Sequence, residues 1–287
     1  MPAARIALWV SSIGGLALLA RTLFLGPVPT WIAAVAFIGY ATLCTLGVLV
    51  PQLEMYGDVA WRGEPGLSAV ALTFDDGPNP KTTRKVLQIL ARGGHKATFF
   101  VVGRKAKQHP EVIREIHAAG HSLGLHGHQH DRTYSLKPPR YVAEDIAKTQ
   151  QAVEDACGVR PTLFRPPVGY VSSRTAAGAK RANVRTVAWS ARGVDGMGPA
   201  DPDRVLDRIE KRLADGAIVL LHDAAERDDF VPATLEILPR LLEIIEEKGL
   251  RAVTVEELLD GPEPGDRPEL LDGPEPTESV KPDADST

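Results

Sequence analysis

Apolar runs alternate with amphipathic segments along most of this chain, from Ala69 to Leu259. Each run is continuous and short, as expected for a strand buried on both faces, and helical periodicity fills the segments between them. This alternation predicts a parallel sheet covered by helices, either open or closed into a barrel. The expected strands are Ala69–Phe74, Ala97–Val102, His121–Leu125, Thr162–Arg165, Arg185–Ser190, Ala217–His222 and Arg251–Val255. The expected helices are Lys81–Arg92, Pro110–Ala119, Arg140–Ala156, Pro202–Ala214 and Pro232–Glu247.

Two uncharged runs precede this region. Ile6–Ala20 lies between Arg5 and Arg21, and Trp31–Val50 has about the 20 residues that a bilayer-spanning helix requires. We expect residues 1–55 to form a transmembrane hairpin in contact with membrane lipid. The alternative is that the first run is a cleaved signal peptide, although Ala20-Arg21-Thr22 is not a convincing small-x-small cleavage site.

The flanking charges give a weak signal for orientation. Two spans place the C-terminal part on the same side of the membrane as the N-terminus. Arg21 is the only charge in the loop between the runs and favours a cytoplasmic loop, whereas Arg5 and the α-amino group favour the reverse. We expect the C-terminal domain to face outward, toward a periplasm or cell wall, with the cytoplasmic face as the alternative. If the first run were cleaved, the second would stop transfer and leave this domain in the cytoplasm.

The rest of the chain divides by composition. Residues 56–68 read as a polar connector, 69–259 as the catalytic domain, and 260–287, which repeat Asp-Gly-Pro-Glu-Pro, as a disordered acidic tail. The net charge of −4 gives no indication of a nucleic-acid partner. A disulfide between Cys44 and Cys157 is not expected, because Cys44 lies in an apolar run.

Unusual polar residues cluster at the carboxyl ends of the expected strands. In parallel α/β folds these ends lie at one edge, where reactive side chains gather. The residues are Asp75 and Asp76 after the first strand, His126 and His130 after the third, Arg165 at the end of the fourth, Asp195 beyond the fifth and His222 at the end of the sixth.

These residue types suit metal-assisted hydrolysis. Two imidazoles four residues apart, His126 and His130, can bind one ion if the segment turns, and a carboxylate as third ligand leaves positions open for water. Asp75 and Asp76 point in different directions, so one can ligate while the other accepts a proton. His222 arrives from another strand and can protonate the leaving group.

The motifs resemble those of the polysaccharide deacetylase (NodB-homology) family, carbohydrate esterase family 4. Thr73–Pro78 is similar to its TFDDGP motif, and His126–His130 to its H-[ST]-x-x-H motif. Phe164–Gly169 resembles its RPP-aromatic-G motif, Trp189–Gly196 its fourth motif, and Leu220–His222 its L-x-H motif. The resemblance spans roughly 69–259. It implies an α/β fold, a distorted (β/α) barrel of about seven parallel strands.

The resemblance also implies roles. Asp76, His126 and His130 would bind a divalent metal, Zn²⁺ first, with Co²⁺ or Ni²⁺ as alternatives. Asp75 would be the general base and His222 the general acid.

The remaining residues would support that pair. Arg165 would orient Asp75, and Asp195 would keep His222 protonated and aligned. Val168, next to Pro167, would offer a backbone N–H to the oxyanion, and Leu220 would wall the acetyl pocket.

Four positions depart from the family pattern. Gly127 replaces a Ser or Thr that braces the metal loop, and Val168 replaces an aromatic residue. Arg192 stands where the fourth motif begins with Asp, and Gly196 where it ends with Trp. All the proposed ligands and acid–base residues remain, so we expect activity. The changed positions line or support the sugar site, which leaves the identity of the sugar open.

We therefore predict a membrane-bound hydrolase that removes an N-acetyl, or an O-acetyl, group from an envelope polysaccharide containing N-acetylglucosamine. The runner-up is a deacylase or deformylase of a lipid-linked aminosugar precursor. A rival from another class is an inactive glycan-binding membrane protein, against which the intact acid–base and metal set argues.

Overall fold

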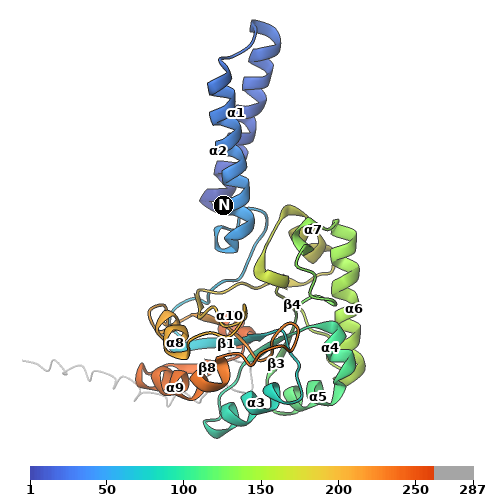
Figure 1. The fold of residues 1–287 in the computed structure, drawn as a ribbon, viewed down its shortest axis with the longest axis vertical. Coiled ribbons are helices and arrows are strands. Elements are labelled where there is room, and N and C mark those ends of the chain that lie inside the picture. The colour runs from blue at the N-terminus through green and yellow to red at the C-terminus, as the bar shows by residue number, and fades with distance from the viewer. Residues whose placement is uncertain (262–287) are drawn as a thin grey trace, which may run out of the picture.

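The computed structural model describes residues 1–261, so the prediction for the acidic tail lies almost wholly outside the described residues. Two long helices open the chain, α1 (Ala3–Leu25) and α2 (Thr30–Leu49). Both are long and apolar enough to cross a membrane, with mean hydropathies of 1.6 and 2.1 and almost no buried residues. Figure 1 shows them as a hairpin that projects from the rest of the molecule, with the N-terminus at the near end.

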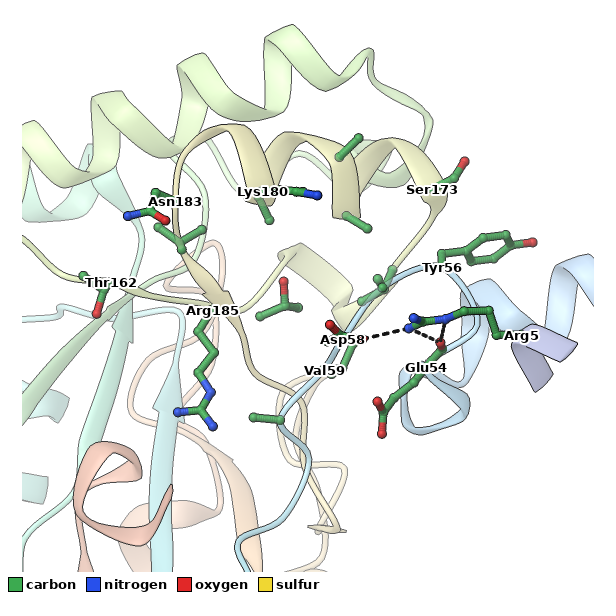
Figure 2. A pocket seen from close by; sticks show the side chains of 18 residues that line it. Arg5, Glu54, Tyr56, Asp58, Val59, Thr162, Ser173, Lys180, Asn183 and Arg185 are labelled. Atoms are coloured by element: carbon green, nitrogen blue, oxygen red, sulfur yellow. Dashed lines mark hydrogen bonds and ion pairs between the residues drawn. The ribbon is translucent and has the colours of Figure 1, made fainter. Parts of the chain in front are cut away.

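The base of the hairpin is fastened to the residues that follow it. The guanidinium of Arg5 donates to the Glu54 carbonyl at 3.0 Å and pairs with Asp58 at 2.9 Å (Figure 2). The Tyr56 hydroxyl donates to the Cys44 carbonyl of α2 at 3.0 Å. These contacts hold the globular part directly against the end of the hairpin.

The globular part is built on a parallel sheet, as predicted. Its order is β5-β4-β3-β2-β1-β7-β6, and β8 also pairs with β1. All the pairings are parallel. The strands are β1 (Ala69–Asp75), β2 (Thr98–Val101), β3 (Ser122–Leu125), β4 (Leu163–Phe164), β5 (Arg185–Thr186), β6 (Ala191–Arg192), β7 (Ile218–His222) and β8 (Arg251–Val253).

The barrel is incomplete at one place. Of the expected strand Arg185–Ser190, only Arg185–Thr186 forms a strand, β5. The next strand, β6, begins one residue beyond the expected end, and β5 and β6 lie at opposite ends of the sheet order. The connector packs against this segment: the Ala60 N–H donates to the Thr186 carbonyl and the Ala60 carbonyl accepts from the Ala188 N–H. The predicted polar connector is therefore part of the barrel wall.

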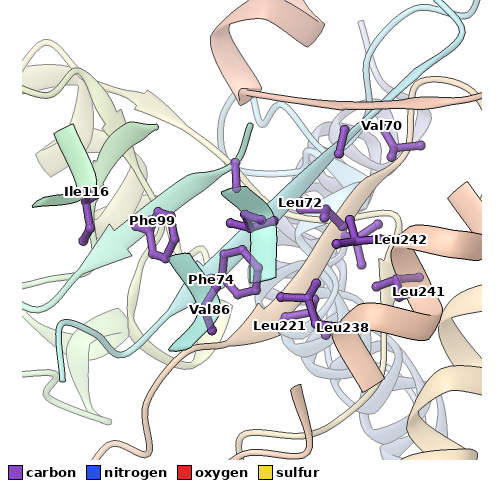
Figure 3. Packing of buried hydrophobic residues seen from close by; sticks show 14 of the residues in the cluster. Val70, Leu72, Phe74, Val86, Phe99, Ile116, Leu221, Leu238, Leu241 and Leu242 are labelled. Carbon is purple, nitrogen blue, oxygen red and sulfur yellow. The ribbon is translucent and has the colours of Figure 1, made fainter. Parts of the chain in front are cut away.

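Helices cover the outside of the sheet (Figure 1). They are α3 (Thr82–Arg92), α4 (Gly103–Gln108), α5 (Pro110–Ala118), α6 (Pro139–Cys157), α7 (Ser173–Arg181), α8 (Pro202–Glu210), α9 (Thr234–Glu247) and α10 (Val255–Asp260). Short 3₁₀ turns occur at Pro51–Leu53, Tyr134–Leu136 and Pro167–Gly169. Helix α9 lays Leu238 and Leu241 against Leu221 of β7, beside Phe74 of β1 (Figure 3). This packing fixes the carboxyl ends of β1 and β7 next to each other.

Candidate active site

The end of β1 presents two adjacent carboxylates to one place. Asp75 is the last residue of the strand, and Asp76 adopts a left-handed backbone conformation with φ 72°. This turn brings both carboxylates near the same imidazole. The Asp75 Oδ2 and Asp76 Oδ1 atoms lie 3.7 and 3.6 Å from Nε2 of His126.

The loop after β3 supplies the two histidines. Nε2 of His130 lies 3.2 Å from Asp76 Oδ1, and the two imidazole rings are 5.0 Å apart. One potential ligand atom from each of Asp76, His126 and His130 lies within 4.8 Å of the others, and all three residues are buried. The structure thus brings together the three residues predicted as metal ligands.

The surroundings of these three residues fit a divalent metal. Nδ1 of His126 lies 2.8 Å from the Arg165 carbonyl, so it carries the proton and leaves the Nε2 lone pair free. Burial lowers the pKa of His126, which keeps the ring neutral as a ligand must be. Within residues 1–261, the buried Oδ1 of Asp76 accepts no hydrogen bond. A buried carboxylate oxygen aimed at two imidazole nitrogens is a cation-binding arrangement.

Glu226 extends the site in a way that the sequence did not reveal. Its Oε1 lies 3.5 Å from Nδ1 of His130, and its other oxygen accepts from Arg132 at 2.9 Å. A carboxylate on this side of the ring can orient the imidazole of a metal-binding histidine. Only the folded chain brings Glu226 to His130, so its position in the sequence gave no signal for this contact.

Asp145 of α6 braces the histidine loop. Its Oδ2 accepts the backbone N–H of His128 at 2.8 Å. At Gly127 the φ is 73°, and a Cβ would lie 3.0 Å from Pro167 and 3.3 Å from Asp145 Oδ2. The brace expected from a Ser or Thr at this position is therefore supplied by a carboxylate from another element.

Arg165 is completely buried and holds Asp75 in place. Its Nη1 donates to Asp75 Oδ1 at 2.7 Å and to the Thr73 hydroxyl at 2.8 Å, and its Nη2 donates to the Ala188 carbonyl at 3.0 Å. The guanidinium also stacks over Phe100 at 4.1 Å. With Oδ1 engaged by Arg165, Oδ2 of Asp75 is the oxygen directed toward His126.

His222 is paired with a buried carboxylate at the end of β7. Its Nδ1 lies 2.9 Å from Asp195 Oδ1, and Asp195 Oδ2 accepts from the His222 backbone and from the Thr234 hydroxyl. Burial alone would lower the pKa of His222, but the charge and hydrogen bond of Asp195 outweigh it and raise the pKa to about 10. The imidazole is therefore held protonated as a donor. Thr234, on α9, is a partner that the sequence analysis missed.

A cleft of about 410 Å³ opens above these groups, a volume suited to a small ligand. Leu220 and Val168 line it, whereas Pro167 is buried beside Gly127 and is not among the lining residues. Val168 has a φ of 64°, a strained conformation for a β-branched residue, and such strain is concentrated at functional sites. A Cβ at Gly196 would lie 2.3 Å from Nε2 of His222, so glycine leaves that nitrogen open.

Asp223, the residue after His222, is buried, and its carboxylate accepts from the Thr83 hydroxyl. Burial raises its pKa to about 7. Asp223 therefore supports the turn beneath the site instead of meeting the substrate.

Comparison with known proteins agrees with these motifs. A model of the polysaccharide deacetylase family matches residues 62–187. A peptidoglycan-N-acetylglucosamine deacetylase of Bacillus cereus is 34% identical over 215 residues, which cover 74% of this chain and 98% of that protein. A chitooligosaccharide deacetylase of Bradyrhizobium is 34% identical over 199 residues, 65% of this chain and 88% of that one.

Solved structures show the same fold. One is a peptidoglycan N-acetylglucosamine deacetylase with a TM-score of 0.67 and 27% identity, covering 74% of this chain and 97% of the other. Another is a CE4 family pseudoenzyme from Bacillus anthracis, with a TM-score of 0.65 and 27% identity, covering 73% and 72%. The family predicted from the motifs is confirmed. The chain belongs to the polysaccharide deacetylase family, carbohydrate esterase family 4, and is a hydrolase of the type that cleaves N-acetyl amide bonds.

Proposed function

We propose that this protein is a membrane-anchored, zinc-dependent deacetylase that removes the N-acetyl group from N-acetylglucosamine units of an envelope glycan. Asp76, His126 and His130 would hold the metal. The observation that carries the proposal is the pairing of two reactive groups with separate buried partners: Asp75 with Arg165, and His222 with Asp195. Pairs of groups whose surroundings assign them opposite proton-transfer tasks are typical of acid–base catalysis.

The proposed reaction uses these residues in sequence. When bound, the metal supplies Lewis-acid activation of water and of the acyl carbonyl. Oδ2 of Asp75 accepts the proton of the attacking water, while Arg165 holds the other carboxylate oxygen. The backbone N–H of Val168 donates to the developing oxyanion. Nε2 of His222 then donates its proton to the departing nitrogen, because Asp195 occupies Nδ1. Leu220 contacts the acetyl methyl group.

The sugar is proposed from the relatives and from the cleft. The two curated relatives described above act on N-acetylglucosamine in peptidoglycan and on chitooligosaccharides, by their names. Trp189 lines the cleft and offers an apolar face for a sugar ring. Arg192 and Gly196 also line the cleft, and both depart from the family pattern. This supports an altered substrate preference.

Zinc is proposed from the donor set. One carboxylate and two imidazoles, with positions left for water, are the ligands of catalytic zinc sites. Co²⁺ and Ni²⁺ accept the same donors.

The membrane anchor is part of the proposal. Helices α1 and α2 expose apolar side chains along their length, among them Trp9, Leu16, Trp31 and Phe37. Such surfaces require a lipid environment, and the aqueous alternative would leave two helices without partners. We place the domain outside the cytoplasm, where envelope glycans are found.

The test is acetate release by the purified full chain from N-acetylchitooligosaccharides, before and after removal of metal with a chelator. We expect activity that is lost on chelation and restored by Zn²⁺, and a His126→Ala variant that retains neither metal nor activity. The likeness to a pseudoenzyme makes an inactive glycan-binding protein the rival. Metal-loaded protein that binds the oligosaccharide without releasing acetate would favour that rival.

A further inference from the structure

A second groove of about 600 Å³ lies beside the catalytic cleft, next to the base of the hairpin. Trp189, Arg192 and Val194 line both the cleft and the groove, so the two share a wall. At its far side the groove reaches Leu49 and Val50, at the end of α2. The groove therefore lies between the catalytic cleft and the end of the proposed membrane anchor.

The charged residues of this groove are all cations. Arg208, Lys211 and Arg212 line it, and Arg192 joins them from β6. Residues 208, 211 and 212 have the i, i+3, i+4 spacing that places side chains on one side of a helix. Of the described residues that line the groove, none carries a carboxylate. Lys211 pairs with Asp207 at 2.6 Å, but within residues 1–261 no acidic group lies within ion-pair distance of Arg192, Arg208 or Arg212.

The simplest interpretation is that these cations complement the carbonyl end of α8, as basic residues commonly do. Two observations are not explained by it. Arg192 comes from a strand, β6, and stacks against Trp189 at 5.6 Å, so it does not belong to the basic residues at the end of α8. The larger cavity at the base of the hairpin, of about 950 Å³, mixes Arg5 and Lys180 with Glu54 and Asp58 (Figure 2), so a uniformly positive lining is not general at this junction.

The groove is also held at a fixed distance from the anchor. The Gln52 side chain donates to the Trp189 carbonyl at 2.8 Å, and the Val171 N–H donates to the Val48 carbonyl of α2 at 3.2 Å. Because Arg5 binds Glu54 and Asp58, the segment between α2 and the domain is held against the hairpin and is not a free linker. A cationic groove at this height meets the phosphate layer of the membrane surface.

We propose that this groove binds the phosphate that joins the sugar substrate to a membrane lipid carrier, so that the enzyme deacetylates a polyprenyl-phosphate-linked aminosugar. The inference rests on the proposed function and specifies its substrate class. Arginine guanidinium groups are suited to phosphate oxygens. In the reaction, water breaks the amide C–N bond and yields acetate and the free amine, while the sugar phosphate bond stays intact. A phospholipid headgroup shares the phosphate chemistry, but it would have no reason to bind next to the catalytic cleft.

The test compares two substrates in the full chain, reconstituted in phosphatidylcholine nanodiscs: polyprenyl-phosphate-linked N-acetylglucosamine and a neutral N-acetylchitooligosaccharide. Lys211→Gln/Arg212→Gln removes two groove cations without touching the cleft. We expect KM for the lipid-linked substrate to rise about tenfold or more, as for the loss of charge-assisted hydrogen bonds, while kcat and KM for the neutral one stay unchanged. The control Arg204→Gln/Lys248→Gln makes the same charge change at exposed positions outside the groove and should behave as wild type.

Equal KM values for the lipid-linked sugar in the groove variant and wild type would overturn the inference. It would also be overturned if the variant lost activity on both substrates alike, because a site for phospholipid headgroups would affect the neutral substrate as much as the lipid-linked one. Failure of the proposed function is a separate result: wild type would then release no acetate from either substrate.

Discussion

Asp195 determines how firmly His222 holds its proton. The pKa of the imidazole, about 10, lies above its usual 6.5 because Asp195 outweighs the effect of burial. The raised pKa of His222 therefore contributes stability that is fully present below about pH 6.5 and is lost as the pH rises through about 10. Asp195, whose pKa is lowered by the same pairing, loses its contribution in acid. The same shift keeps the proposed general acid protonated at neutral and moderately alkaline pH.

Asp195→Asn should move the alkaline limb of the pH–rate profile to lower pH. The carboxylate charge is removed, so the pKa of His222 falls by about 1–3 units, the usual effect of one close charge. The measurement is kcat/KM for acetate release across pH, with the metal content of each sample checked. An alkaline limb that stays in place would mean that His222 is not the acid that this limb reports.

At the scale of elements, the sequence located the residues that sit at strand ends and missed those whose position depends on packing. Asp75, Asp76 and His222 follow long apolar strands, so their convergence could be predicted. Glu226 lies on a loop and Thr234 on α9. The residues that flank each of them in the sequence do not indicate which site residue it contacts in the fold.

The length of each element decided whether it was foreseen. Short strands β4, β5 and β6 are fixed by pairing more than by pattern, which is why the expected strand Arg185–Ser190 is reduced to β5 and why β6 was not foreseen. Helix α4 was missed because its sequence is polar, and it buries Lys105 through a contact from Nζ to the Ala225 carbonyl at 2.7 Å.

Asp145→Ala should loosen the metal loop from a distance. Losing the hydrogen bond to the His128 backbone leaves His126 and His130 less well placed, and the loss of such outer partners typically lowers metal affinity by about 10–100-fold. Zinc affinity can be measured by competition with a chromophoric chelator. Glu144→Ala, on the exposed side of the same helix, is the matched control. Equal zinc affinities in the two variants would remove Asp145 from the metal site.

At the scale of the whole molecule, the contacts at the hairpin base give Arg5 a structural partner. Arg5 was one of the charges that left the orientation open, and its pairing with Asp58 places it with the catalytic domain. This supports the proposal that the N-terminus and the domain lie on the same side of the membrane.

Orientation can be tested with reporters fused after residue 259. We expect alkaline phosphatase, which requires an oxidising compartment, to be active in the fusion, and a cytoplasm-dependent fluorescent reporter to be dark. The physical reason is that Arg21, alone in the loop between the helices, is retained inside. The reverse pattern would place the enzyme in the cytoplasm, and its substrate on the inner leaflet.

The central claim is that neighbouring carboxylates divide the work, Asp76 as metal ligand and Asp75 as proton acceptor. Asp75→Asn and Asp76→Asn should be measured side by side for bound metal and for acetate release. We predict that Asp75→Asn keeps its metal and loses about 10²-fold or more in kcat, whereas Asp76→Asn loses metal and activity together. Loss of metal from Asp75→Asn, with retention in Asp76→Asn, would contradict this account of the site.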